Sequence, residues 1–195
     1  IAGFGFNRTR VPEHPFLGLE PFPTDGFNVV LAHGSDITRV PFDKVQHAPF
    51  TVDEIAGKNV GYCGLGHYHQ QRSVPNPIDG AEIWYSGIPE GRGWDEPGDC
   101  GYLLGEIDGG AVTVTSRVCN QHPLRTLTID CEGFSSREQI VDAILRQHGS
   151  ALDARTIRRV RLEGLLDPRL ELSFEEMEER IAEEVLHIQW VDETR

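Results

Sequence analysis

The segment Gly64-Leu65-Gly66-His67-Tyr68-His69 places the strongest constraint on what this chain can fold into. It continues an apolar run that begins at Val60 and predicts a buried β-strand. Side chains two residues apart in a strand point to the same side, so we expect both imidazoles to face one pocket. Because neutral imidazole is a common ligand of zinc, manganese and iron, the pattern predicts part of a metal site. The alternative is a solvated loop that carries two histidines.

A second apolar run also ends in a histidine. Residues 27–34 read Phe-Asn-Val-Val-Leu-Ala-His-Gly, which predicts a buried strand with His33 at its C-terminal edge. Ligands of layered α/β folds bind at the carboxyl ends of strands. A single histidine in this position would be structural, but together with the later pair we expect His33 to be a metal ligand. His47 lies in a loop-like stretch and is expected to be a surface residue.

Composition excludes several classes of protein. The chain has 195 residues and a net charge of −13, which argues against a protein that coats nucleic acid over its whole surface. No apolar run is long enough to span a membrane. The four cysteines are scattered and form no Cys-x-x-Cys pair, which argues against a disulfide framework and fits a cytoplasmic location. The chain opens on Ile1 in what reads as the middle of a strand, so we expect a segment to precede it.

The pattern of strands and turns divides the chain into residues 1–117 and 118–195. In the first part, residues 81–85 predict a strand, and Asp108-Gly109-Gly110 between two apolar runs predicts a β-hairpin. The glycine-rich stretch 91–96 is interpreted as a shaped connection, with a phosphate-binding loop as the alternative. In the second part, capping-box patterns at Ser136 and Ser173 alternate with strand-like runs. This predicts a small two-layer unit in the order β-α-β-α-β.

Arginines alternate along one of the strands predicted in the second part. In Ile157-Arg158-Arg159-Val160-Arg161-Leu162, alternation places Arg159 and Arg161 on the face opposite Val160 and Leu162. This face is a candidate for contacts with phosphates of nucleic acid. The alternative is the solvated outer face of a half-buried sheet.

Taken together, these motifs resemble part of a known family. The His33-Gly34 strand end, the Gly-His-x-His segment and Tyr85-Ser86-Gly87-Ile88-Pro89 resemble the second half of a calcineurin-like metallophosphoesterase domain. With the β-α-β-α-β unit after them, they resemble the SbcD-type DNA repair nuclease subunit, in which a capping domain follows the catalytic domain. The resemblance implies that residues 1–117 are part of a four-layer α/β/β/α sandwich and that residues 118–195 are the capping domain.

The resemblance also implies a chemistry. It implies two divalent metal ions, Mn²⁺ in nucleases of this type, which promote phosphodiester hydrolysis. Carried over by position, His33 and His67 would bind the second ion and His69 the first. Implied partners are DNA, an SMC-like ATPase subunit of the SbcC type and, in a homodimer, a second copy of the chain.

One departure from the family is large. The Asp-x-His and Gly-Asn-His-Asp motifs of the family do not occur in the sequence. We expect these motifs and the Gly-Asp motif of the family, which together supply the remaining ligands and the catalytic histidine, to precede this chain. We therefore assign no catalytic residue and expect the chain to be inactive alone. Two alternatives stay open: a metallophosphoesterase acting on a small phosphodiester or monoester, and a non-catalytic interaction module.

Overall fold

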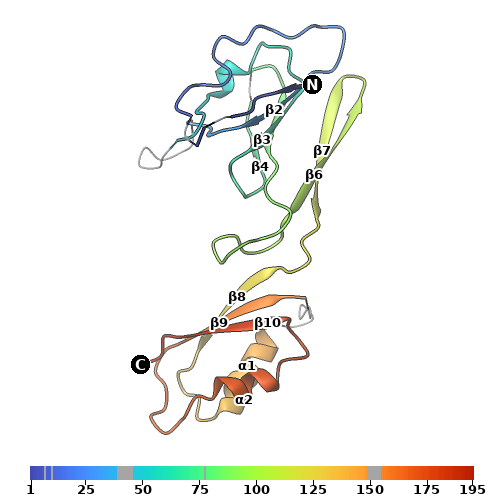
Figure 1. The fold of residues 1–195 in the computed structure, drawn as a ribbon. Coiled ribbons are helices and arrows are strands. Elements are labelled where there is room, and N and C mark those ends of the chain that lie inside the picture. The colour runs from blue at the N-terminus through green and yellow to red at the C-terminus, as the bar shows by residue number, and fades with distance from the viewer. Residues whose placement is uncertain (7, 10, 39–45, 77, 149–154) are drawn as a thin grey trace. The chain divides into compact units, whose positions relative to one another are not determined.

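The chain is of mixed α/β structure as a whole and folds into two compact units, of which the second holds the described α-helices (Figure 1). In the computed structural model, all residues from Ile1 to Arg195 are described except 7, 10, 39–45, 77 and 149–154. The first unit comprises residues 1–89 and 101–118, and the second comprises residues 90–100 and 119–195. The sequence pattern had not separated residues 90–100 from the first part of the chain.

The first unit is built on a five-stranded sheet in the order β1-β2-β3-β5-β4. Strands β1, β2, β3 and β5 pair in parallel, whereas β4 pairs antiparallel with β5. The predicted strands β2, β3 and β5 are present; β4 was missed because it is short and lies beside a proline-rich turn. The bounds are β1 (Ala2–Gly3), β2 (Val29–His33), β3 (Tyr62–Gly66), β4 (Arg72–Val74) and β5 (Glu82–Tyr85), with a short 3₁₀ helix, η1 (Val52–Glu54).

The two faces of this sheet are covered unequally. One face carries the buried side chains of Val30, Leu65 and Tyr85, which pack against Phe16 and other residues of the first core. The opposite face includes Leu31, whose relative exposure is 49%. Parallel sheets usually bury both faces, so this exposed apolar position is unusual for a central strand.

The predicted hairpin is present as a separate two-stranded sheet. Strand β6 (Gly101–Asp108) pairs antiparallel with β7 (Ala111–Val118) over its whole length. The connecting residues Gly109 and Gly110 have φ angles of 56° and 87°. Positive φ at both central positions is what a tight hairpin turn of this kind requires, and glycine adopts it without strain.

The second unit has the predicted order of elements. Its three-stranded sheet, β10-β9-β8, is parallel throughout. Helices α1 and α2 are the crossover connections that parallel strands need. The bounds are β8 (Leu124–Asp130), α1 (Arg137–His148), β9 (Ile157–Glu163), α2 (Phe174–Glu179) and β10 (His187–Asp192).

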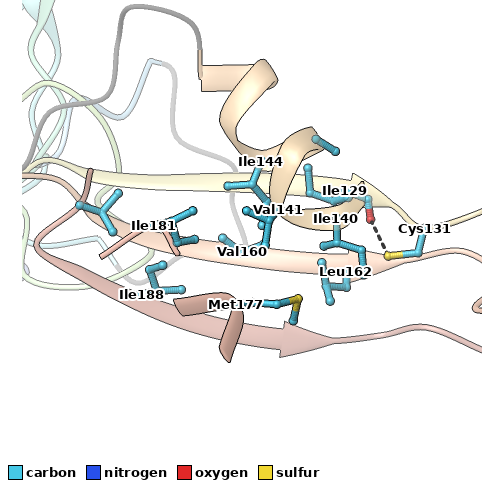
Figure 2. Packing of buried hydrophobic residues seen from close by; sticks show 12 residues of the cluster. Ile129, Cys131, Ile140, Val141, Ile144, Val160, Leu162, Met177, Ile181 and Ile188 are labelled. Atoms are coloured by element: carbon cyan, nitrogen blue, oxygen red, sulfur yellow. Dashed lines mark hydrogen bonds between the residues drawn. The ribbon is translucent and has the colours of Figure 1, made fainter. Parts of the chain in front are cut away.

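A single core joins the sheet and helices of the second unit (Figure 2). Ile140 and Ile144 on α1, together with Met177 on α2, pack against Val160 and Leu162 on β9. All five side chains are at most 2% exposed. The alternation of β9 therefore directs Arg159 and Arg161 to the other face, as predicted. Among the described helices, none is both long enough and apolar enough to cross a bilayer.

Candidate functional site

His33 and His67 come together at the carboxyl edge of the first sheet. His33 is the last residue of β2 and is paired with Gly66, the last residue of the parallel strand β3. His67 follows directly, and the centroids of the two imidazole rings lie 5.4 Å apart at an interplanar angle of 66°. Two strands that end at the same edge thus deliver histidines from positions far apart in the sequence.

Gly66 makes room for the His33 ring. A Cβ atom at this position would lie 2.8 Å from His33 Nδ1, which is closer than side chains tolerate. The next residue, His67, has a φ of 102°. Such a conformation is rare for a non-glycine residue and persists only where its surroundings hold it in place. The Gly-His pair is therefore shaped to bring the two rings together.

His47 belongs to the same cluster, so its assignment as a surface residue was wrong. Its half-buried ring lies 5.8 Å from that of His33 and 6.0 Å from that of His67, measured between centroids. Phe6 contacts both His47 and His33 with its edge-on ring, at 4.9 Å and 6.2 Å. These contacts explain the burial of His47.

Backbone pairing positions His47, which is why sequence reasoning missed it. The Ser35 N–H donates to the His47 carbonyl at 2.9 Å, and the His47 N–H donates to Ser35 Oγ at 3.1 Å. Gly34 allows this close approach, because a Cβ there would lie 2.3 Å from the carbonyl oxygen of Ala48. The pairing joins two irregular segments, and no periodic pattern in the sequence predicts it. The only local signal was the histidine itself beside an apolar Pro49-Phe50 pair.

His69 is exposed and lies at the margin of the cluster. Its charge is close enough to lower the pKa values of both His33 and His67. The structure brings His33 and His67 into ring contact, whereas the strand ends at Gly66, before His67, and His69 does not line the hollow beside these rings. The expectation that alternation would turn His67 and His69 into one pocket therefore does not hold.

The cluster favours neutral imidazole. Partial burial lowers the pKa of His33, and the charges of His47 and His69 lower it further. Burial likewise lowers the pKa of His67, followed by the charges of His33, His47 and His69. Because burial and nearby like charges both disfavour the charged form, His33 and His67 favour the neutral ring with a free lone pair. Neutral imidazole is the form that binds metal.

An open hollow of about 820 Å³ lies over these rings. The N-terminal segment forms its other wall and contributes the cation of Arg8, which is exposed and paired with Glu13 at 3.1 Å. The hollow is wide enough for a phosphate-sized group. Its lining residues are Phe4, Gly5, Phe6, Arg8, Thr9, His33, His47 and His67.

A buried tyrosine supports the turn after His33. Tyr85, at the end of β5, donates its hydroxyl proton to the Gly34 carbonyl at 2.8 Å and accepts from the Asp36 N–H at 2.9 Å. Burial raises the pKa of this phenol, so it remains a donor. The ring of Tyr68 packs against both Tyr85, at 4.7 Å, and His67, at 4.9 Å. The tyrosines thus link the two strand ends that carry His33 and His67.

The donor chemistry of this cluster fits the imidazole share of a metal site. Neutral nitrogen ligands suit zinc, manganese and iron, and they bind without cancelling the charge of the ion. Within the described ranges of the chain, however, no group of three or more His, Cys, Asp or Glu side chains has the geometry to hold a metal ion. The rings are gathered but do not form a finished coordination shell.

The predicted arginine face lies in the second unit and is engaged in intramolecular contacts. The Arg159 guanidinium stacks 4.3 Å from the centroid of the Trp94 ring, and its Nε donates to Gln189 at 3.0 Å. Arg161 forms an ion pair with Glu193 at 3.0 Å. In the glycine-rich stretch 91–96, Arg92 pairs with Glu96 at 2.8 Å, as expected of a shaped connection.

Comparison of the sequence with models of known protein families gives no match. Comparison with curated proteins gives no match either.

Proposed function

We propose that the protein is a metal-dependent phosphoesterase and that this chain contributes histidine ligands through His33, His67 and His69. The observation that carries the proposal is the meeting of His33 and His67 at adjacent parallel strand ends, 5.4 Å apart. The carboxyl edge of a parallel sheet is where α/β proteins bind ligands. The lowered pKa values of both rings support the same role, since a metal competes with protons for these nitrogens.

Divalent ions at this edge, Mn²⁺ by family resemblance, would supply Lewis acidity to a phosphate and a water acidic enough to act at neutral pH. The residues of the chain would then bind the substrate phosphate and orient it. Arg8 offers a cation in the hollow for a phosphate oxygen, whereas Phe4 and Phe6 contribute apolar rings to its wall. Tyr85 holds the turn that follows His33. His47, in ring contact with both, would serve as a further ligand.

The same proposal assigns each unit to a domain of the family. The first unit would be part of the four-layer sandwich of a calcineurin-like metallophosphoesterase, a reading supported by the parallel sheet with Leu31 on an exposed face. The second unit, with its β-α-β-α-β order, would be the capping domain. The protein would then act in the cytoplasm as the nuclease subunit of an SbcD-type complex, with DNA as substrate, an SbcC-type ATPase as partner and a homodimer as the assembly.

Hydrolysis of a small phosphodiester or monoester is the second candidate function. The net charge of −13 favours it over a DNA substrate. The contacts of Arg159 with Gln189 and of Arg161 with Glu193 favour it too, since these arginines already have partners within the chain.

The test is an activity assay on the protein in the form that its gene encodes. With Mn²⁺ present, we expect cleavage of linear duplex DNA to exceed that of a chromogenic phosphodiester. His67→Ala should abolish cleavage, whereas His187→Ala, at an exposed position of β10, should preserve it. Turnover of the small diester alone would select the second candidate. Undiminished turnover in His67→Ala would refute the metal-site assignment, and a protein without bound metal or activity would be a non-catalytic module.

A further inference from the structure

Two of the four cysteines lie at opposed backbone positions at the base of the β6–β7 hairpin. Cys100 directly precedes β6 and Cys119 directly follows β7. The last registered pair of the ladder is Gly101 with Val118, so the next opposed positions are the two cysteines. The Cys119 N–H donates to the Cys100 carbonyl at 3.0 Å, which extends the pairing of the two strands by one hydrogen bond. Asn120 N–H donates to the same carbonyl at 3.2 Å and fixes the pairing further.

This placement matches what a disulfide requires. Residues that are directly opposed in an antiparallel pair point to the same face, with Cα atoms about 5.5 Å apart at hydrogen-bonded positions. Disulfides span Cα separations of about 4.4–6.8 Å. Burial raises the pKa of Cys100, and the charge of Cys119 adds to the rise, as expected for near neighbours.

The other two cysteines are not candidates for such a bond. Cys63 is fully buried in the core of the first unit. Cys131 is fully buried in the core of the second, where its thiol contacts the Ile129 carbonyl at 3.9 Å (Figure 2). Each is enclosed by a different set of apolar side chains, and neither can meet a reagent from solvent without opening its core.

The two cysteines of the hairpin base differ in a way that sets an order of reaction. Cys119 is exposed and is the first thiol that a reagent meets. Cys100 is half-buried, and burial together with the carboxylates of Glu90, Glu96 and Asp99 raises its pKa. Cys100 is therefore the slower nucleophile and reacts second, as a resolving thiol.

We propose that Cys100 and Cys119 form a reversible intramolecular disulfide, with a low-molecular-weight disulfide such as oxidised glutathione as the oxidant. The Cys119 thiol loses its proton to solvent, and its thiolate attacks one glutathione sulfur and releases the first reduced glutathione. The Cys100 thiolate, likewise deprotonated, attacks Cys119 Sγ and releases the second. Two protein thiols are oxidised to one disulfide, and one oxidised glutathione is reduced to two thiols.

The bond would close a covalent ring around the whole hairpin. The chain passes from the second unit to the first between Cys100 and Gly101, and returns between Val118 and Cys119. A disulfide here would join the two residues that flank the hairpin, and it would prevent the base of the hairpin from opening. It would make the pairing at the hairpin base sensitive to the thiol–disulfide balance of the surroundings, independently of the histidine cluster.

Peptide mapping after exposure to oxidised glutathione tests the proposal. Trypsin cleaves after Arg117, between the two cysteines, so the bond would hold peptide 93–117 to peptide 118–125. We expect the folded protein to lose two of its four thiols and to yield this linked pair, which a reductant separates. Cys63→Ala should give the same linked pair. Cys100→Ser should instead retain one glutathione on peptide 118–125.

Four outcomes would overturn the proposal. The first is retention of all four thiols. The second is a stable glutathione adduct on Cys119 of the unchanged protein with no linked peptides. The third is a link that includes peptide 59–72 or 126–137, which carry Cys63 and Cys131. The fourth is linkage found only between two chains on a non-reducing gel.

Discussion

The sheets of the two units each bury one face and differ on the other, and the candidate site lies in the unit whose open face is apolar. In the second unit, α1 and α2 bury the side chains of Val160 and Leu162 completely. In the first unit, the central strand β2 leaves Leu31 about half exposed. Alternation places His33 on the same face as Leu31. The open face of the second sheet carries Arg159 and Arg161, whereas that of the first carries an exposed leucine with imidazoles at its edge.

The sharpest way to test this contrast is a matched pair of leucine truncations. Leu162→Ala should cost about 2–5 kcal/mol of unfolding free energy, because it leaves a cavity in a closed core. Leu31→Ala should cost less than about 1 kcal/mol, since half of that side chain is already in water. Urea unfolding followed by peptide-level hydrogen exchange would report each unit separately. Equal losses of unfolding free energy in the two variants would contradict the difference in burial between the two leucines.

Removal of the Tyr85 hydroxyl should weaken the edge that holds His33. Tyr85→Phe leaves the buried Gly34 carbonyl and Asp36 N–H without this partner, which should cost about 1–3 kcal/mol. Protection from hydrogen exchange should fall in residues 33–36 and remain unchanged in the second unit. Tyr102→Phe, at an exposed position of β6, is the control and should leave stability unaltered. Loss of protection throughout the chain would show that the tyrosine supports more than this turn.

A methyl group at Gly66 should disturb the ring of His33 directly. Gly66→Ala places a Cβ 2.8 Å from His33 Nδ1, so the ring must move and metal affinity should fall by about 10- to 100-fold. Gly105→Ala is the matched control, since its added Cβ would meet only Val112 Cγ2 at an ordinary 3.6 Å. Calorimetric titration with a divalent ion measures both. Unchanged affinity in Gly66→Ala would mean that His33 is not a ligand.

Acidification should destabilise the first unit slightly. The pKa values of His33 and His67 are lower in the folded chain than the ordinary value of 6.5. The unfolded chain therefore binds more protons as pH falls below about 6.5, and stability drops with it. Above that pH the contribution of these groups is fully present. Thermal unfolding between pH 7.5 and 5 should show the decrease, and His67→Asn should reduce it. A gain in stability of the first unit on acidification would contradict the lowered pKa values of His33 and His67.

Local patterns in the sequence were enough to predict the second unit and the hairpin. Apolar spacing identified the helix face with Ile140 and Ile144, and Asp108-Gly109-Gly110 identified the turn, because these features depend on nearby residues. His33 and His67 were also predictable, since each follows an apolar run and parallel strands end at a common edge. His47 was not, because hydrogen bonds between two irregular segments bring it there. Such pairing leaves no periodic trace in a sequence.

The arginines show a second limit. Alternation correctly assigned the face of Arg159 and Arg161, but it could not show that Trp94 stacks on Arg159, since residue 94 lies outside the predicted second part. Whether these side chains contact nucleic acid depends on groups from distant segments that compete for them. Periodicity predicts the direction of a side chain, not its partner.

Uptake of Co²⁺ by this chain tests the central claim most directly. Cobalt prefers imidazole nitrogen more strongly than manganese does, and its visible absorption reports the ligands. We expect the chain to bind Co²⁺ with a spectrum typical of nitrogen ligands, His33→Ala and His67→Ala each to abolish binding, and His187→Ala to preserve it. Absence of uptake by the unchanged chain, or equal uptake by all four proteins, would contradict a metal site built on these histidines.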